Sequence, residues 1–362
     1  MIKKILILLP NDKLGGAEQH LKNVTSYFLS KEYEVDVYFL KKETGGQWRG
    51  MSEKLNLFFT RQRRESFGVI SLLIKLLQNR SQNYEYLFTS HAHLNFFAGL
   101  LIRCGIIKKK YFIGRESTSV FKRFTGGKLF LFRILYKIGY GKLDLLICQT
   151  NYMKHQLVEA LPKLVSKINI QVIPNPIDLE NIKLDDIDFN LKNQNYIVSA
   201  GRLISVKGFD ILIRAFASIK NKFPDMKLVI LGEGSERTAL ELLAKEIGVI
   251  DDVLLLGFKK NVYTYFKFAR ACVVSSRIEG FPNVLLQMMS QNNTVISTLC
   301  AGGIDEIPSI YTCEPDNAKS LAYKIEQSLT NDTSANRGIF DDFLAKRSIQ
   351  AFIRQVNQYL ND

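Results

Sequence analysis

The sequence predicts an α/β protein made of two open parallel sheets, and three observations lead to this prediction. Short apolar runs alternate with helical patterns along the whole chain. In each half, the first apolar run is followed by a glycine-containing loop, at residues 11–16 and 201–208. Pro174 and Pro176 open a polar stretch that runs to Asn195, which indicates a domain boundary. A length of 362 residues also suits two domains.

In the first half, an apolar run predicts a strand at residues 5–9, and a helix is expected from about residue 17. Further apolar runs predict strands at 35–40, 86–89, 111–114 and 145–149. Helical patterns separate these runs, and helices that connect strands in this way cover a parallel sheet. We therefore expect an N-terminal domain over residues 1–172.

The second half repeats this layout. Strands are expected at 196–200, 227–231, 253–256, 271–275 and 295–298, with a helix at 209–220 whose apolar side chains recur at helical spacing. These elements predict a second domain over residues 173–345. The last segment, 346–362, carries one apolar stripe and is expected to form a helix that packs back on the N-terminal domain.

The positive charge of the chain is concentrated in its first half. The formal net charge is +14, and residues 1–172 hold 28 Lys and Arg against 12 Asp and Glu. The densest part, residues 106–142, interleaves basic side chains with Phe, Leu and Tyr, which is typical of a surface that binds anionic membranes. A solvated basic helix over a core face is the alternative. No nucleic-acid-binding motif accompanies the charge, so no nucleic-acid partner is expected.

Three absences narrow the class of protein. The apolar run near the N-terminus ends at Pro10 and is too short for a signal peptide. No stretch approaches the ~20 apolar residues of a membrane-spanning helix. The five cysteines form no CxxC pair, which favours reduced thiols and argues against a zinc cluster. We therefore expect a cytoplasmic protein.

Two glycine loops are candidates for anion binding. Gly15 and Gly16 lie between the first strand and its helix, where backbone N–H groups can approach an anion. This loop lacks the GxGxxG spacing of dinucleotide-binding folds, and a simple tight turn is the alternative. In the second half, Arg202 and Lys207 lie between glycines at a strand end. A guanidinium fork and a mobile ammonium can converge there on a diphosphate, unless both are ordinary surface cations.

A third loop follows the strand expected at 271–275. Its sequence, EGFPN, presents backbone amides at the start of a helix. The Glu279 carboxylate in this loop can accept hydrogen bonds from sugar hydroxyls. Asn283 is either a ligand-binding residue or the cap of the helix.

Together these segments resemble the family 4 glycosyltransferases, which have the GT-B fold. The resemblance rests on GGAE (15–18), VIPNPID (172–178), GRLISVKGFDILIRAF (201–216), LGEG (231–234) and SSRIEGFPNVLLQMMS (275–290). It covers nearly the whole chain, although the N-terminal half matches only in layout, in the GGAE loop and in a histidine. The resemblance implies two Rossmann-like domains that face a central cleft. It also implies a retaining, metal-independent transferase that uses a nucleotide-sugar donor and no cofactor.

In the second half, the resemblance assigns roles to the residues that match the family's motifs. Arg202 and Lys207 would bind the donor diphosphate and stabilise charge on the leaving nucleotide. Glu279, the first Glu of the family's E-x7-E pattern, would contact the donor sugar. Further contacts to the donor would come from Gly280, Phe281 and Asn283.

In the first half, the resemblance implies that Gly16 approaches a phosphate or the acceptor through its backbone. His91 follows an expected strand and matches a histidine that faces the donor sugar. His93 is the weaker candidate, and we interpret His20 and His155, on expected helices, as structural.

One position departs from the family's pattern. Gln287 stands where the second Glu of E-x7-E would accept hydrogen bonds from the ribose hydroxyls. A Gln amide offers one acceptor and two donors, so it can bind a ribose through neutral hydrogen bonds. Asp186 and Asp188 spell the DxD pattern with which the other major glycosyltransferase fold holds a divalent metal. No strand precedes them, so we interpret them as linker charge and expect no metal site.

The sequence thus predicts transfer of a sugar, with retention, from a UDP-linked donor to a lipid-linked glycan acceptor. The reaction is expected at the inner face of the cell membrane, as in capsule or O-antigen synthesis. A nucleotide-sugar epimerase of the same architecture is one alternative, which would consume nucleotide-sugar without an acceptor. A non-catalytic membrane-bound partner is another, suggested by Gln287 but disfavoured by the presence of Arg202, Lys207 and Glu279.

Overall fold

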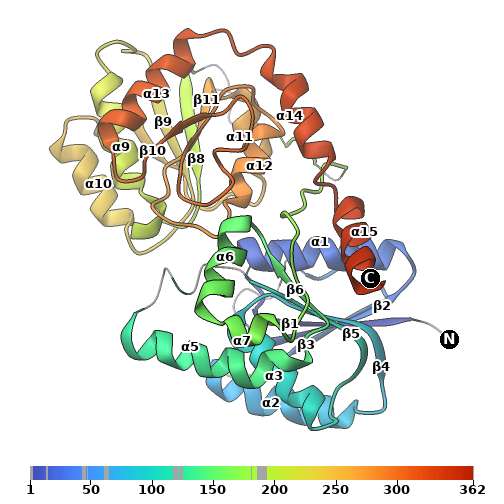
Figure 1. The fold of residues 1–362 in the computed structure, drawn as a ribbon. Helices are drawn as coiled ribbons and strands as arrows, with labels where there is room; N and C mark the ends of the chain where they lie inside the picture. The colour runs from blue at the N-terminus through green and yellow to red at the C-terminus, as the bar shows by residue number, and fades with distance from the viewer. Residues whose placement is uncertain are drawn as a thin grey trace. The chain divides into compact units, whose positions relative to one another are not determined.

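The computed structural model describes residues 3–13, 15–42, 46, 48–60, 65–116, 121, 125–180, 182–185 and 194–361. The chain divides into two compact units. Unit 1 consists of Met1–Pro176 with Ile349–Asp362, and unit 2 consists of Ile177–Ser348. Each unit contains one parallel β-sheet with helices on both faces (Figure 1).

Unit 1 is built on a seven-stranded parallel sheet in the order β3-β2-β1-β4-β5-β6-β7. Its strands are β1 (Lys4–Asn11), β2 (Glu34–Lys41), β3 (Leu55–Phe59), β4 (Asn83–Thr89), β5 (Lys108–Arg115), β6 (Leu145–Cys148) and β7 (Ile170–Val172). Every strand expected in this half is present. β1 and β2 are buried along nearly their whole length because helices cover both faces of the sheet.

The sheet extends beyond the expected strands at both edges. β3 pairs only with β2, and its five residues are mostly half-buried. β7 has three residues and pairs only with β6. An edge strand needs less buried surface than a central one, so its apolar pattern is weak and both strands were missed.

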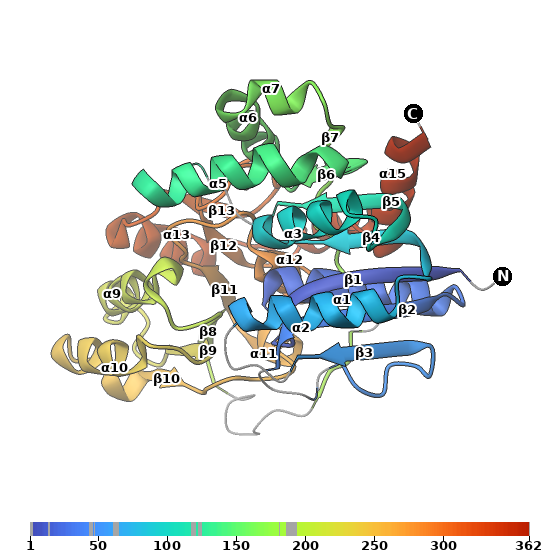
Figure 2. The same ribbon diagram turned by 90° about the horizontal axis from the view of Figure 1, so that it is seen from below.

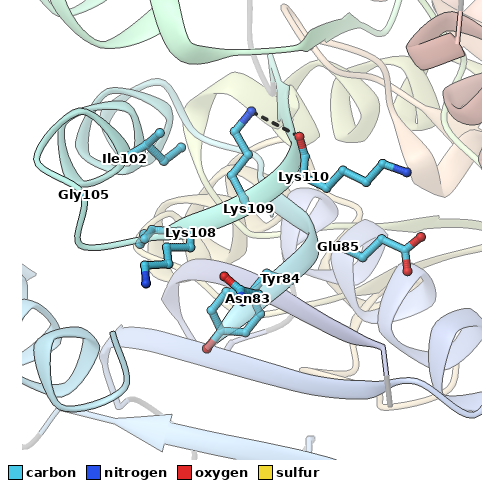
Figure 3. A pocket seen from close by; sticks show the side chains of 9 residues that line it. Asn83, Tyr84, Glu85, Ile102, Gly105, Lys108, Lys109 and Lys110 are labelled. Atoms are coloured by element: carbon cyan, nitrogen blue, oxygen red, sulfur yellow. Dashed lines mark hydrogen bonds between the residues drawn. The ribbon is translucent and has the colours of Figure 1, made fainter. Parts of the chain in front are cut away.

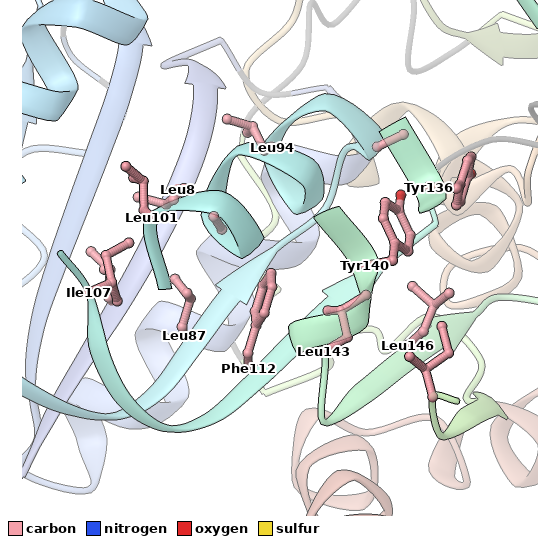
Figure 4. Packing of buried hydrophobic residues seen from close by; sticks show 14 of the residues in the cluster. Leu8, Leu87, Leu94, Leu101, Ile107, Phe112, Tyr136, Tyr140, Leu143 and Leu146 are labelled. Atoms are coloured by element: carbon pink, nitrogen blue, oxygen red, sulfur yellow. The ribbon is translucent and has the colours of Figure 1, made fainter. Parts of the chain in front are cut away.

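Helices cover the two faces of this sheet in separate layers (Figures 1 and 2). One face carries α1 (Gly16–Ser30) and α15 (Ile349–Asn361). The other carries α2 (Glu65–Gln78), α3 (Ala92–Arg103), α5 (Gly126–Gly139), α6 (Asn151–Ala160) and α7 (Pro162–Val165). The core beneath this second layer includes Leu87, Leu101 and Phe112 (Figure 4).

Two glycines allow α3 and α5 to approach closely. A Cβ on Gly99 would lie 1.9 Å from the carbonyl oxygen of Gly139, and a Cβ on Gly139 would lie 2.4 Å from the Cα of Phe96. No larger residue fits at either position. The close approach places Tyr136 and Tyr140 in the core, where Figure 4 shows them beside each other.

The last helix belongs to unit 1 although the chain reaches it from unit 2. Its apolar stripe, which includes Phe352 and Val356, is buried against α1 and the sheet. Tyr86 of β4 donates a hydrogen bond to Asn357 Oδ1 over 2.9 Å. The buried His20 ring of α1 packs edge to face on Phe352, with centroids 4.9 Å apart, and so occupies a structural position.

Unit 2 repeats the arrangement with six parallel strands in the order β10-β9-β8-β11-β12-β13. They are β8 (Tyr196–Ala200), β9 (Lys227–Leu231), β10 (Val253–Leu255), β11 (Ala271–Val274), β12 (Val295–Thr298) and β13 (Tyr311–Cys313). All five expected strands are present, and only the three-residue edge strand β13 was missed. The two parallel, Rossmann-like sheets are the sheets of the GT-B fold.

Helices cover both faces of this second sheet as well. One core lies under α9 (Phe209–Ile219), α10 (Arg237–Glu246) and α13 (Ala318–Thr330). The other lies under α11 (Tyr263–Phe268), α12 (Asn283–Met289) and α14 (Asn336–Ala345). Over the part of the chain that the structure describes, no helix has the length and hydropathy of a membrane span.

Candidate active site

The loop after β8 is held in one conformation by its neighbours. The Leu203 N–H donates to the Glu233 carbonyl over 2.9 Å. Gly208, at the start of α9, has a φ of 62°, and a Cβ there would lie 2.1 Å from the Ser275 carbonyl oxygen. A glycine is therefore required at 208 for both conformation and space. The loop is a fixed support for the candidate side chains of Arg202 and Lys207.

Lys207 and Glu279 form an ion pair although they are 72 positions apart in the chain. Lys207 Nζ donates to Glu279 Oε1, and Ser276 Oγ donates to the same oxygen over 3.0 Å. The two side chains of the pair are 19% and 18% exposed. They meet because β8 and β11 are neighbours in the sheet, so the loops that follow these strands are adjacent. The pair combines a cation that can face a phosphate with a carboxylate that can accept from a hydroxyl.

Arg277 fixes the loop that carries Glu279. Its two terminal nitrogens donate to both carboxylate oxygens of Asp210, over 2.9 and 2.7 Å, and its Nε donates to Asp316 Oδ1 over 2.5 Å. Burial acts to raise the pKa of Asp210, but the bonds from Arg277 hold it below its usual value. The remaining candidate cation, Arg202, has an exposed side chain.

The EGFPN loop places its members in different surroundings. Gly280 is buried, and the Phe281 side chain belongs to the core, with the Arg347 guanidinium 5.3 Å from its ring centroid. α12 begins at Asn283, with Pro282 in the capping position. Phe281 can therefore offer a ligand its backbone more readily than its buried ring, while Asn283 is half-buried at the helix start.

Gln287 lies half-buried on α12 and contacts α11. Its Nε2 donates to the Tyr263 hydroxyl over 3.3 Å. Burial raises the pKa of Tyr263 above its usual value, so this phenol is neutral near pH 7. The position therefore presents a neutral amide and a neutral hydroxyl where the family's pattern has a carboxylate.

In unit 1, the glycine loop leads directly into α1. Gly15 occupies the capping position with extended backbone, φ −87° and ψ −176°, and the helix begins at Gly16. Glu18 is the acidic residue of the first turn, and its side chain is buried. The first helical N–H groups thus lie at the C-terminal end of β1, as expected for Gly16.

His91 lies at the end of β4, in the capping position of α3. Its Nδ1 is 3.2 Å from Ser90 Oγ, and its Nε2 is 3.5 Å from Glu18 Oε1. Burial lowers the pKa of His91 to about 3, helped by the neighbouring His93 and by the positive charge of Arg115. The imidazole is therefore neutral near pH 7.

Sequence reasoning missed Arg115 and gave no role to Glu18. Arg115 ends β5 and is 3% exposed, and it donates to Asn175 Oδ1 over 2.5 Å. Its Nε and Nη1 are buried, and the described residues give them no hydrogen-bond partner. An Arg at the C-terminal end of an expected apolar strand, here 111–114, is the signal that could have identified it, because such positions lie at the ligand-binding edge of a parallel sheet.

The next residue, Glu116, is also buried, and its hydrogen bonds connect the C-terminal edge of the sheet to α5. It accepts hydrogen bonds from the hydroxyls of Tyr136 and Tyr140, over 2.7 and 2.8 Å. Asn95 donates to the Tyr140 hydroxyl over 3.1 Å, and the Thr89 hydroxyl is bonded to Asn95. Burial raises the pKa of Glu116 to about 7, against the effect of these hydrogen bonds and of the neighbouring Arg115.

A cavity of about 650 Å³ lies at the opposite end of the same strands (Figure 3). Asn83, at the start of β4, and Lys108, at the start of β5, are among its lining residues. Parallel α/β sheets bind ligands at the carboxyl ends of their strands, where His91 and Arg115 lie. We therefore do not interpret this cavity as the active site.

The sequence offers one candidate metal motif, the DxD pattern at 186–188. Asp186 and Asp188 lie outside the described residues. Within the described ranges, no group of three or more His, Cys, Asp and Glu side chains is arranged to hold a metal ion.

Family models identify the class of this two-sheet protein. Residues 14–181 match the model described as Glycosyltransferase Family 4, and residues 182–339 match the model described as Glycosyl transferases group 1. The two models together span residues 14–339, and the chain therefore belongs to the family 4 (group 1) glycosyltransferases, which have the GT-B fold.

Individual relatives agree with this assignment. The chain is 32% identical over 204 residues, 55% of its length, to the N-acetylgalactosamine-N,N'-diacetylbacillosaminyl-diphospho-undecaprenol 4-alpha-N-acetylgalactosaminyltransferase of Campylobacter jejuni. It is 24% identical to an uncharacterized glycosyltransferase of Haemophilus influenzae, over 91% of both chains. An uncharacterized glycosyltransferase of Methanocaldococcus jannaschii is 32% identical over 48% of this chain. The chain spans about half the length of the Methanocaldococcus and Campylobacter relatives, 44% and 54%.

Solved structures share the fold. HepE of Anabaena in complex with UDP-glucose superimposes with a TM-score of 0.80 at 16% identity, over 99% of both chains. Sucrose-phosphate synthase of Thermosynechococcus elongatus gives a TM-score of 0.80 at 16% identity, over 98% of both chains.

Proposed function

We propose that this chain is a retaining glycosyltransferase that moves a sugar from a UDP-sugar to a lipid-linked glycan in surface-polysaccharide synthesis. The observation that carries the proposal is the ion pair of Lys207 with Glu279, on loops fixed by Gly208 and Arg277. It brings one cation and one carboxylate to adjacent strand ends, where open α/β sheets bind their ligands, and the two groups can bind a phosphate and a sugar hydroxyl.

The proposed reaction assigns a task to each side chain. Lys207 and Arg202 bind the diphosphate and stabilise the charge that develops on it as the bond from C1 of the sugar to the phosphate oxygen breaks. Glu279 accepts hydrogen bonds from hydroxyls of the donor sugar, and His91 contacts the same sugar. The acceptor hydroxyl oxygen bonds to C1 on the face that the phosphate leaves, and its proton passes to a phosphate oxygen. No cofactor and no metal enters the proposed reaction.

The nature of the acceptor is inferred from relatives. The name of the Campylobacter relative states a diphospho-undecaprenol-linked sugar as its acceptor. Other similar proteins are named for lipopolysaccharide core synthesis in Rhizobium meliloti and capsular polysaccharide synthesis in Staphylococcus aureus. For this chain we propose an acceptor of the kind that the Campylobacter name states, a lipid-linked glycan. The basic first half of the chain suits an acceptor held at the inner face of the cell membrane.

Helix α5 is the part of the basic stretch that we propose to dock on the membrane. Phe130, Leu131, Ile134 and Ile138 recur at helical spacing and are 66%, 55%, 36% and 42% exposed. The helix carries Lys and Arg and no Asp or Glu. An apolar stripe flanked only by cations fits an anionic lipid surface, which receives the apolar side chains between its headgroups. Elsewhere in the stretch, Phe112 of β5 is buried in the core.

Incubation with a panel of nucleotide-sugars tests the proposed reaction. UDP-sugars are expected to raise the melting temperature, since a ligand bound only to the folded state stabilises it. With a polyprenyl-diphosphate-linked glycan, NMR of the product should show the same anomeric configuration as the donor, and EDTA should leave the rate unchanged. Product formed without acceptor, as an epimerised nucleotide-sugar, would favour the epimerase alternative. Binding without any turnover would favour the non-catalytic partner.

A further inference from the structure

Three side chains of unit 1 come together at the C-terminal edge of its sheet from three different elements. Glu18 comes from the first turn of α1, His91 from the end of β4 and Arg115 from the end of β5. Glu18 is 8% exposed and Arg115 is 3% exposed. Burial of a carboxylate and of a guanidinium each costs free energy. Their placement beside an imidazole therefore points to a functional role.

The surroundings of the His91 ring select one tautomer. Glu18 Oε1, 3.5 Å from Nε2, belongs to a carboxylate that can only accept a hydrogen bond. The position of this carboxylate favours a proton on Nε2 of the neutral ring, and Nδ1 can then accept from the Ser90 hydroxyl at 3.2 Å. Distances of this kind are often long without substrate and shorten when it binds.

Arg115 supplies the charge that balances Glu18. Among the described residues, the guanidinium makes one hydrogen bond, to a neutral group, Asn175 Oδ1. The negative charges of Glu18 and Glu116 act to raise the pKa of Arg115, against the larger effect of burial. The charge of Arg115 acts in turn to lower the pKa of His91.

We propose that Glu18 is a positioning residue that fixes the orientation and tautomer of His91, with Arg115 as its balancing cation. This inference rests on the proposed function, in which His91 contacts the donor sugar. Glu18 acts through the imidazole, so its contribution should exist only while His91 is present.

A double-mutant cycle tests this dependence. Glu18→Gln keeps an acceptor but removes the charge, and Glu18→Ala removes both. We expect Glu18→Ala to lower kcat about 10- to 100-fold with little change in KM for the UDP-sugar. In a His91→Ala background the same change should cost less than about twofold. Gln19→Ala, the next residue on α1, is the matched control, because its side chain bonds only to Asn23 among the described residues, and it should leave kcat unchanged.

If kcat of the double variant falls by the product of the two single losses, the inference is overturned. Glu18 would then act independently of the imidazole. A tautomer measurement separates this failure from failure of the proposed function. The chain has four histidines, so ¹H–¹⁵N NMR can assign His91 by comparison with His91→Gln. We expect the Nε2–H tautomer in the native protein and a mixture in Glu18→Ala. An unchanged tautomer in that variant contradicts the inference, whether or not the protein transfers sugar.

The pH dependence tests Arg115. Among the described residues, the charged or titratable groups found around His91 are Glu18 from α1, His93 from α3 and Arg115 from β5. Removing the cation in Arg115→Met should raise the pKa of His91 from about 3 toward its usual value. The acid limb of the kcat profile should then move to higher pH, because more imidazole is protonated as the pH falls. Arg115→Lys keeps the charge and should keep the limb in place. If the acid limb of the kcat profile lies at the same pH in the native protein, Arg115→Met and Arg115→Lys, the role of the Arg115 charge is refuted.

Discussion

Replacement of Lys207 by Ala is the most direct test of the proposed donor site. The Lys207 side chain is 19% exposed and its ammonium is paired with Glu279, so the pair is largely shielded from water. Loss of one preorganised group that stabilises charge in the transition state costs about 3 kcal/mol, which is about 100-fold in rate. We expect kcat/KM of Lys207→Ala to fall by at least this factor.

The same change also lowers stability, and the two effects must be separated. Glu279 loses its cation but keeps the hydrogen bond from Ser276. The loss of a hydrogen bond to a charged group destabilises by about 1.5–3 kcal/mol, and partial exposure of Glu279 places the expected loss at the lower end.

Lys220→Ala is the matched control for this comparison. Lys220 is also 19% exposed and is paired with Asp252 over 2.9 Å, at the end of α9 far along the helix from Gly208. Lys220 Nζ also donates to the carbonyls of Pro224 and Met226, so Lys220→Ala should lose at least as much free energy of unfolding as Lys207→Ala in urea titrations. Only Lys207→Ala should lose turnover of the UDP-sugar. Turnover of Lys207→Ala within a few-fold of the native protein, or an equal loss in Lys220→Ala, would refute the assignment of Lys207 to the diphosphate.

Three further predictions concern other parts of the molecule. His91→Ala should lower kcat strongly and leave the Kd for UDP near its native value in calorimetry, because the proposed nucleotide contacts lie on unit 2; a parallel loss of affinity would make the histidine structural. Gln287→Glu should tighten UDP binding by ~1 kcal/mol through charge-assisted hydrogen bonds, and Gln287→Ala should weaken it by a similar amount. Unchanged Kd values in both variants would mean that Gln287 only packs against Tyr263. The double variant Phe130→Ser, Leu131→Ser should sediment less with anionic vesicles than the native protein does. Binding of the native protein to these vesicles should weaken as the salt concentration rises. Equal binding of the native protein to neutral vesicles would reject electrostatic docking.

The fold was predictable where burial leaves a strong pattern. Central strands such as β1 and β8 are buried along their length, so their sequences read as continuous apolar runs. The missed strands β3, β7 and β13 lie at sheet edges and carry only three to five residues. Their existence depends on pairing with a neighbouring strand, which is a tertiary property and leaves little trace in the sequence.

The candidate site was predictable in unit 2 to a greater extent than in unit 1. Lys207 and Glu279 belong to motifs that the sequence displays, and the structure brings their side chains together. The partnership of Glu18 with His91 depends on which strands are adjacent, and that adjacency is not local in sequence. Arg115 looks like the end of a basic strand in the sequence, and only its burial and its partly unpaired guanidinium distinguish it from Lys108 or Lys110.

The two contacts that carry the proposals occupy the same place in their own sheets. In unit 1 the strand order reverses between β1 and β4, and in unit 2 it reverses between β8 and β11. Loops that leave two such strands diverge to opposite faces, so the strand ends between them stay open to a ligand. Glu18 and His91 follow β1 and β4, and Lys207 and Glu279 follow β8 and β11. Each unit thus places a carboxylate beside a nitrogen group, the His91 imidazole in unit 1 and the Lys207 ammonium in unit 2, at the strand ends where its topology leaves room for a substrate.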